Sequence, residues 1–181
     1  MKKKLVRAFG FIEIWIEKIG KNVSWLILLL VVIAAYNAVA RYLGKYFSYQ
    51  LSSNALLEIQ WYLFSIVFLL GASYTLKKNK HIRVDVFYES FSEEKKRKLN
   101  FWGNVFLLLP FCITGIVVCI PSVWDSWSIL ESSPDPNGLP RYPIKTVALL
   151  GFLLLFLQAI VKIYRGYTLL YKTKGIEEAG E

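Results

Sequence analysis

Glu58 is the acidic residue whose setting most resembles that of a functional group. It lies near the start of an apolar stretch, beside Gln60 and Trp61. A carboxylate inside a lipid bilayer costs free energy, so an acidic residue at that depth often marks an ion or substrate pathway. Glu58 is only about one helical turn from the preceding polar segment, where it is partly hydrated. The sequence therefore favours a structural role, in which Glu58 caps a helix or pairs with Arg41, over ion coupling.

His81 and Asp85 are four positions apart, so on a helix their side chains share one face and can form a hydrogen bond. His81 is the only histidine, which excludes a haem held by two histidines of this chain and a zinc site built on several. The chain has no Gly-rich phosphate loop and no serine elbow. We therefore predict no catalytic residue, no metal, no cofactor and no enzymatic activity.

Cys112 and Cys119 are the only cysteines, and they lie seven positions apart in one apolar stretch. On a helix this spacing is a rise of about 10 Å, too far for a disulfide. We expect both to be small packing residues.

Four long apolar stretches must position these residues. Each approaches the roughly 20 residues that a helix needs to cross a bilayer. They use most of a 181-residue chain that is 55% hydrophobic, so no separate soluble domain fits. We predict an all-α integral membrane protein with a leader at 1–22, a four-helix membrane domain at 23–165 and a tail at 166–181. The predicted spans are residues 23–40, 56–76, 102–127 and 144–164.

Basic residues are distributed unevenly around these spans. Of the 22 Lys and Arg residues, 18 lie in or near the leader, the middle connection and the tail, and four lie at the other two connections. The positive-inside rule then places both termini and the middle connection in the cytoplasm. The formal charge of +9 is thereby explained by topology and anionic lipid, without nucleic acid. A signal peptide cleaved near Ala40 is the alternative, but the first stretch is longer than a signal peptide requires, which favours a retained helix.

Amphipathic segments flank the spans on the predicted cytoplasmic side. Apolar residues of the leader recur every three or four positions from Leu5 to Ile19, so the leader either lies in the headgroup layer or extends the first span. A second such stripe covers Val84 to Phe91, and Ser92 is placed to cap the next helix. Tryptophans near the span ends are expected to anchor the helices at the membrane surface. They are Trp15, Trp61, Trp102 and Trp127.

Small residues and prolines predict further features. Gly71-Ala72-Ser73 in the second span is expected to allow close helix packing. Pro110 and Pro121 are expected to bend the third span. Four of the six prolines fall between residues 131 and 143, which predicts a stiff outer loop without helix or strand.

Several of these elements together resemble one family. They are Arg41-Tyr42, Glu58, Leu70-Gly71-Ala72-Ser73, His81-Ile82-Arg83-Val84-Asp85 and the outer loop Gly138-Leu139-Pro140-Arg141-Tyr142-Pro143. The chain is thus similar to the small membrane subunit of tripartite ATP-independent periplasmic (TRAP) transporters. The resemblance covers about residues 25–165.

The resemblance implies a bacterial inner-membrane protein and two protein partners. A large multi-spanning subunit would hold the cation and substrate sites and move as an elevator, and a periplasmic binding protein would deliver an organic acid. The small subunit would serve as a scaffold. Arg41, Glu58, His81 and Asp85 then take structural or interface roles, and no substrate-binding residue is assigned in this chain. Two alternatives stay open: a self-assembling small carrier or channel, and a membrane enzyme or redox anchor.

Overall fold

The structure is a computed structural model that describes residues 2–47, 52–80, 88 and 90–177. This part of the chain is helical apart from short connections and one isolated bridge between Ser132 and Pro140. The helices are α1 (Lys2–Phe47), α2 (Asn54–Lys77), α4 (Glu93–Gly103), the π-helix η1 (Asn104–Leu108), α5 (Leu109–Ser128) and α6 (Tyr142–Glu177). The predicted helical fold class is confirmed.

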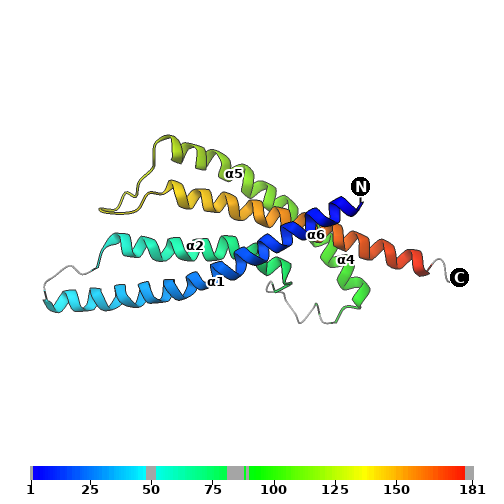
Figure 1. The fold of residues 1–181 in the computed structure, drawn as a ribbon, viewed down its shortest axis with the longest axis horizontal. Coiled ribbons are helices and arrows are strands. Elements are labelled where there is room, and N and C mark those ends of the chain that lie inside the picture. The colour runs from blue at the N-terminus through cyan, green and yellow to red at the C-terminus, as the bar shows by residue number, and fades with distance from the viewer. Residues whose placement is uncertain (1, 48–51, 81–87, 89, 178–181) are drawn as a thin grey trace.

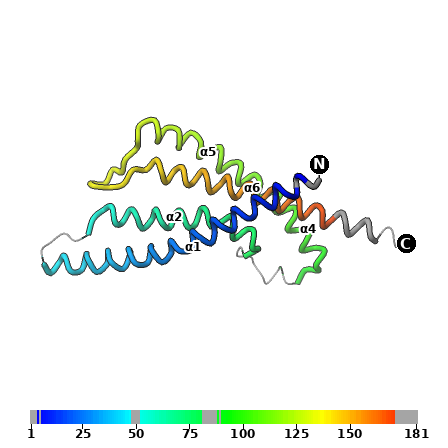
Figure 2. Tube along the Cα trace, viewed as in Figure 1, coloured from blue at the N-terminus to red at the C-terminus, as the bar shows by residue number. Residues whose placement is uncertain are grey.

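The long helices form an open layer rather than a closed bundle. α2 packs against both α1 and α6, and α6 packs against α5, so the order across the layer is α1, α2, α6, α5 (Figure 1). We call the end where α1 passes to α2 and α5 passes to α6 the hairpin end. The opposite end, where α1 begins and α6 ends, is the terminal end (Figure 2).

Four helical segments of the described chain are long and apolar enough to cross a membrane. Among the side chains that the structure describes, nine apolar residues are buried, and dozens of large apolar side chains remain exposed. An exposed apolar surface of this extent requires lipid or protein around it. The segments are Val6–Phe47, Asn54–Lys77, Glu93–Ser128 and Tyr142–Leu170.

The predicted leader and the first span form one helix. α1 runs without a break for 46 residues, which is the second of the two arrangements considered for the leader. Its first half crosses α2 and reaches α6 at the terminal end (Figure 1). Gly20 makes this crossing possible, because a Cβ atom at that position would overlap the side chain of Tyr74. The membrane boundaries of the leader, the four-helix domain and the tail stay predictions.

The third span begins with a capped helix and changes pitch before a proline. The Ser92 side chain accepts a hydrogen bond from the Lys95 amide, so the predicted cap is confirmed. η1 follows, and the Leu109 amide bonds to the carbonyl of Asn104, five residues earlier. Pro110 comes next, and because it lacks an N–H and crowds the preceding turn, a wider turn at this point relieves the conflict. Pro121 lies inside α5, which continues past it.

The predicted close packing at Gly71-Ala72-Ser73 is only partly correct. Gly71 faces open space, whereas Ser73 is fully buried and Ala72 packs on the core cluster. α2 and α6 approach each other closely at Gly151, where a Cβ atom would lie 3.0 Å from the carbonyl oxygen of Leu69. The core cluster consists of Leu76, Cys112, Leu155 and Ala159. Cys112 and Cys119 are both free thiols, as predicted.

Candidate functional site

Glu58 holds the α5–α6 loop against α2 at the hairpin end. Its carboxylate accepts hydrogen bonds from the Ser133 hydroxyl and from the Leu139 backbone amide. The side chain is 3% exposed, so both oxygens are satisfied by the protein rather than by bulk water. Buried charge is tolerated when donors surround it in this way. This arrangement joins the α5–α6 loop to α2 through both oxygens of Glu58.

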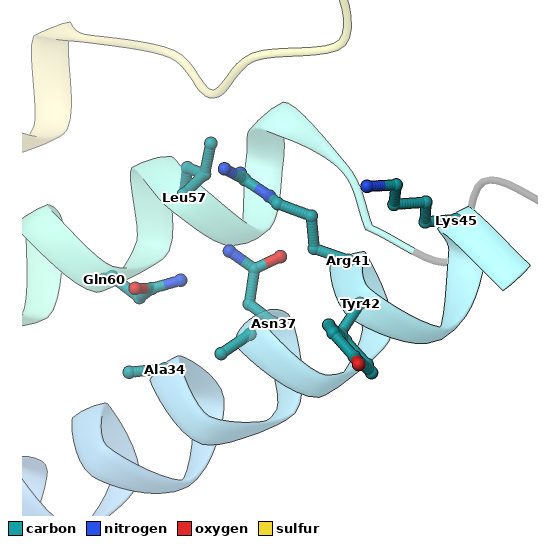
Figure 3. A pocket seen from close by; sticks show the side chains of 8 residues that line it. Ala34, Asn37, Arg41, Tyr42, Lys45, Leu57 and Gln60 are labelled. Carbon is teal, nitrogen blue, oxygen red and sulfur yellow. The ribbon is translucent and has the colours of Figure 1, made fainter.

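The predicted pair between Arg41 and Glu58 is wrong. Within the described residues, Glu58 binds the α5–α6 loop, and Arg41 instead lines a cavity between α1 and α2 (Figure 3). The physical reason is that a hydroxyl and a backbone amide supply donors without carrying charge. A search of the sequence for opposite charges therefore overlooks them, and the structural role of Glu58 stays a prediction.

The rest of the α5–α6 loop is fastened to its surroundings at several points. The Tyr62 hydroxyl donates to the carbonyl of Pro140 at 2.7 Å, and the Asn54 amide donates to the carbonyl of Pro136 at 3.1 Å. Glu131 bonds to Lys145 and to the Ser126 hydroxyl. Both contacts lower the pKa of Glu131, and the contact with the Lys145 ammonium has the larger effect. These bonds fasten the loop in addition to its prolines, and its stiffness stays a prediction.

Acidic residues of α1 hold the terminal end together. Glu13 accepts a bond from Arg165 of α6, and its backbone carbonyl accepts one from Lys77 at 2.9 Å. Glu17 forms ion pairs with Lys77 at 2.5 Å and Lys78 at 3.5 Å. Three helices therefore meet through one network of charges. Sequence reasoning missed this network, although the signal was present: two acidic residues four positions apart in a basic leader.

Two of the four predicted interface residues cannot be placed. His81 and Asp85 lie outside the described residues, as does most of the predicted amphipathic segment from Val84 to Phe91. Tyr88 is described, and its hydroxyl accepts a hydrogen bond from Asn100 of α4 at 2.6 Å. The Lys96 ammonium of α4 lies 5.6 Å from the centre of the same ring, so Tyr88 joins this segment to α4 through two contacts.

The four predicted tryptophan anchors are each about half exposed. Trp127 donates from Nε1 to the Thr146 hydroxyl at 2.8 Å, which ties α5 to α6 at the hairpin end. Their placement at a membrane surface stays a prediction. No group of three His, Cys, Asp or Glu residues suited to a metal occurs among the described side chains.

Helix lengths, exposed apolar surface and internal ion pairing define the class of this protein as a multi-pass, all-helical membrane protein. Residues 25–169 match the family described as the DctQ component of tripartite ATP-independent periplasmic transporters. The match covers well over half of the chain, so the chain belongs to the DctQ family. Members of this family are non-enzymatic and work with a large DctM subunit and a periplasmic binding protein. No curated protein matched the chain.

Proposed function

We propose that this chain is the static scaffold of its transporter, on which the large DctM subunit is mounted. The observation that supports this role best is the open layer of four helices. A closed four-helix bundle buries its apolar seam inside, whereas this layer leaves the outer helices α1 and α5 covered by apolar side chains. On α1 these include Leu28, Val32 and Val39, and on α5 they include Val117, Val118 and Trp124.

The polar residues inside the layer support a structural role rather than a transport path. Glu13 and Glu58 are the buried carboxylates of the described chain, and each is bonded within the protein. A carboxylate that couples transport to a cation must exchange partners during the cycle. Glu58 instead joins two elements of one rigid layer. This weighs against the alternative of a self-assembling carrier.

Charge supports an orientation for the scaffold. The terminal end carries the leader, the tail and the start of α4, which hold most of the basic residues, while the hairpin end holds few. We infer that the terminal end faces the cytoplasm of a bacterial cell and that the hairpin end faces the periplasm. The α5–α6 loop fastened by Glu58 then lies on the side from which the binding protein approaches.

Substrate recognition and coupling are assigned to the other two subunits. We infer that an organic acid is delivered by the periplasmic binding protein and carried by DctM with a coupling cation. Arg41, Glu58, His81 and Asp85 serve this chain's own architecture and its interface with DctM. Membrane lipids surround the remaining apolar surface.

Reconstitution of the three proteins tests the proposal. The substrate is first identified by the rise in melting temperature of the binding protein across a panel of organic acids. Liposomes then receive this chain alone, DctM alone or both, with the binding protein and a sodium gradient outside. Uptake is expected only when both membrane subunits are present. Uptake by this chain alone would overturn the scaffold role.

A matched pair of variants tests the supporting observation. Val32→Arg and Val117→Arg place one charge on the outer face of α1 or of α5, and both positions are exposed in the chain alone. A charge in a protein interface disrupts assembly, whereas the same charge against lipid mainly affects insertion. After correct insertion is verified, co-purification with DctM is expected to fail for only one of the two variants, the one whose charge lies in the interface with DctM. Equal retention of DctM by both would refute docking through an outer helix.

A further inference from the structure

A cavity of about 530 Å³ lies between α1 and α2 near the hairpin end (Figure 3). Its α1 wall is a single helical face, because positions 34, 37, 38, 41, 42 and 45 have the i, i+3, i+4, i+7, i+8 and i+11 spacing of one side of a helix. The α2 wall is formed by Leu57 and Gln60. Both helices belong to this chain.

The chemistry of the cavity changes along α1. Ala34 and Ala38 form an apolar section, and their small side chains leave the space open. Asn37 follows with its amide directed between the two helices, and Gln60 points toward it from α2 (Figure 3). Arg41 and Lys45 then place two positive charges toward the end of α1. The lining therefore combines apolar and amide groups in its first part with cationic groups toward the end of α1.

Asn37 carries a buried acceptor without a donor, and the exposed Arg41 and Lys45 are without an ion-pair partner among the described residues. Asn37 is 3% exposed, yet its Oδ1 atom has no hydrogen-bond partner. No ion pair joins Arg41 or Lys45 to a carboxylate elsewhere in residues 2–47, 52–80 and 90–170. A buried acceptor without a donor costs free energy, so such an atom in a cavity indicates a missing partner.

We propose that this cavity binds the headgroup of a membrane phospholipid, a function beyond the scaffold role. The phosphodiester lies against Arg41 and Lys45, and a headgroup donor, such as a glycerol hydroxyl or an ethanolamine ammonium, bonds to Asn37. The start of an acyl chain follows Ala34 and Ala38. One ligand thereby supplies an anion, a donor and an apolar tail, one for each kind of group in the wall. A free phosphate lacks the tail, and a carboxylate from a protein partner lacks both the donor and the tail.

The position of the cavity agrees with this ligand. Arg41 and Lys45 lie at the end of a long apolar segment, where phosphates of a bilayer leaflet lie beside a spanning helix. Arg and Lys at this depth orient toward the headgroup layer. The lipid would fill the gap between α1 and α2 and hold the two helices together at the hairpin end.

Native mass spectrometry of the full chain tests the proposal. The chain is purified in mild detergent, delipidated and titrated with phosphatidylglycerol or phosphatidylethanolamine. One tightly bound phospholipid per chain is expected, and Arg41→Gln or Lys45→Gln should each weaken its binding about tenfold, the loss of one charge-assisted hydrogen bond. Lys95→Gln combined with Lys98→Gln removes two charges from α4 and should leave this binding unchanged.

Two further experiments distinguish a phospholipid from other occupants of the cavity. One is a variant that fills the cavity, and the other is competition by soluble headgroup analogues. Ala38→Leu adds apolar volume without changing charge and should abolish tight lipid binding while helix content, measured by circular dichroism, is preserved. Inorganic phosphate and glycerophosphoglycerol should fail to displace the lipid at millimolar concentration. Displacement by either would show an anion site without lipid specificity and overturn the proposal. Unchanged lipid binding in the Arg41→Gln, Lys45→Gln double variant would overturn it as well. The assay needs no DctM, so its result is independent of the scaffold role.

Discussion

Arg165 on α6 donates a hydrogen bond to the carboxylate of Glu13 on α1, across a separation of 152 residues. The two side chains differ in solvent exposure: Glu13 is largely buried, and Arg165 is mostly exposed. Through this bond the first turns of the chain are held to its last helix. The leader is consequently part of the helical layer, and this ion pair lies at the same end of the layer as the buried apolar residues Ile16 and Leu76.

Removal of Arg165 should release the start of α1. Arg165→Gln leaves the Glu13 carboxylate without its ionic partner, while Lys77 still binds the Glu13 carbonyl. A partly exposed ion pair of this kind contributes about 1 kcal/mol, so a double-mutant cycle with Glu13→Gln should give a coupling of that size. Hydrogen exchange over residues 2–20 is the measurement, and faster exchange is expected in the single variant.

A control variant separates this pair from a general effect of charge. Lys98→Gln removes one charge from an exposed pair with Glu94 on α4. It should leave exchange at residues 2–20 as in the wild type. Equal exchange in all three proteins would mean that the leader is held by other contacts.

Loss of the Glu58 carboxylate should free the α5–α6 loop. Glu58→Gln keeps one acceptor for the Leu139 amide, whereas Glu58→Ala removes both bonds. Trypsin cleavage after Arg141 in the detergent-solubilised chain should therefore be slowest in wild type, faster in the Gln variant and fastest in the Ala variant. Asp135→Asn changes an exposed acidic residue of the same loop and should cleave like wild type. A Glu58→Ala protein cleaved no faster than Asp135→Asn would contradict the loop-holding role.

The sequence predicted the spanning helices because hydropathy and length are sums over about 20 residues, which tertiary contacts rarely reverse. It also located Glu58 and the Ser92 cap, since both depend on local pattern. The Leu139 backbone N–H was missed as a partner of Glu58 because every residue type except proline carries such a donor, so the sequence does not single it out. The spatial order of the helices was not predicted, because the same hydropathy profile along the sequence is compatible with an open layer and with a closed bundle.

The Glu131–Lys145 pair should make stability depend on pH. Because Lys145 lowers the pKa of Glu131 below its ordinary value of 4.5, the folded protein holds the ionised form more strongly than the unfolded chain does. This stabilising contribution is complete above that ordinary value and is lost as pH falls through the lowered pKa. The melting temperature of wild type should exceed that of Glu131→Gln near neutral pH, and the two should converge in acid. With Lys145→Gln in both proteins, the difference should be small throughout.

Two glycines should respond oppositely to the same substitution. A Cβ atom at Gly151 would lie 2.8 Å from the Cβ of Leu69 and 3.0 Å from its carbonyl oxygen, so Gly151→Ala must push α6 away from α2. Overpacking of this kind costs about 1–3 kcal/mol. Gly71 on α2 has nothing within 4 Å, and there Ala should stabilise the helix by up to about 1 kcal/mol. Thermal unfolding in detergent measures both, and equal destabilisation would refute the close approach at Gly151.

Asn37→Leu should stabilise the delipidated chain. The change keeps the branched shape and the number of side-chain heavy atoms, and it removes a 3% exposed amide whose Oδ1 atom is unpaired, which costs about 1–3 kcal/mol in the folded state. Added phosphatidylglycerol should reverse the ranking, because a ligand that binds only the folded protein raises its stability and the variant has lost a contact to that ligand. Melting temperatures measured with and without lipid should therefore cross between the two proteins. If lipid raised both equally, Asn37 would have no part in binding, and if the variant were less stable without lipid, its amide would already be satisfied within the protein.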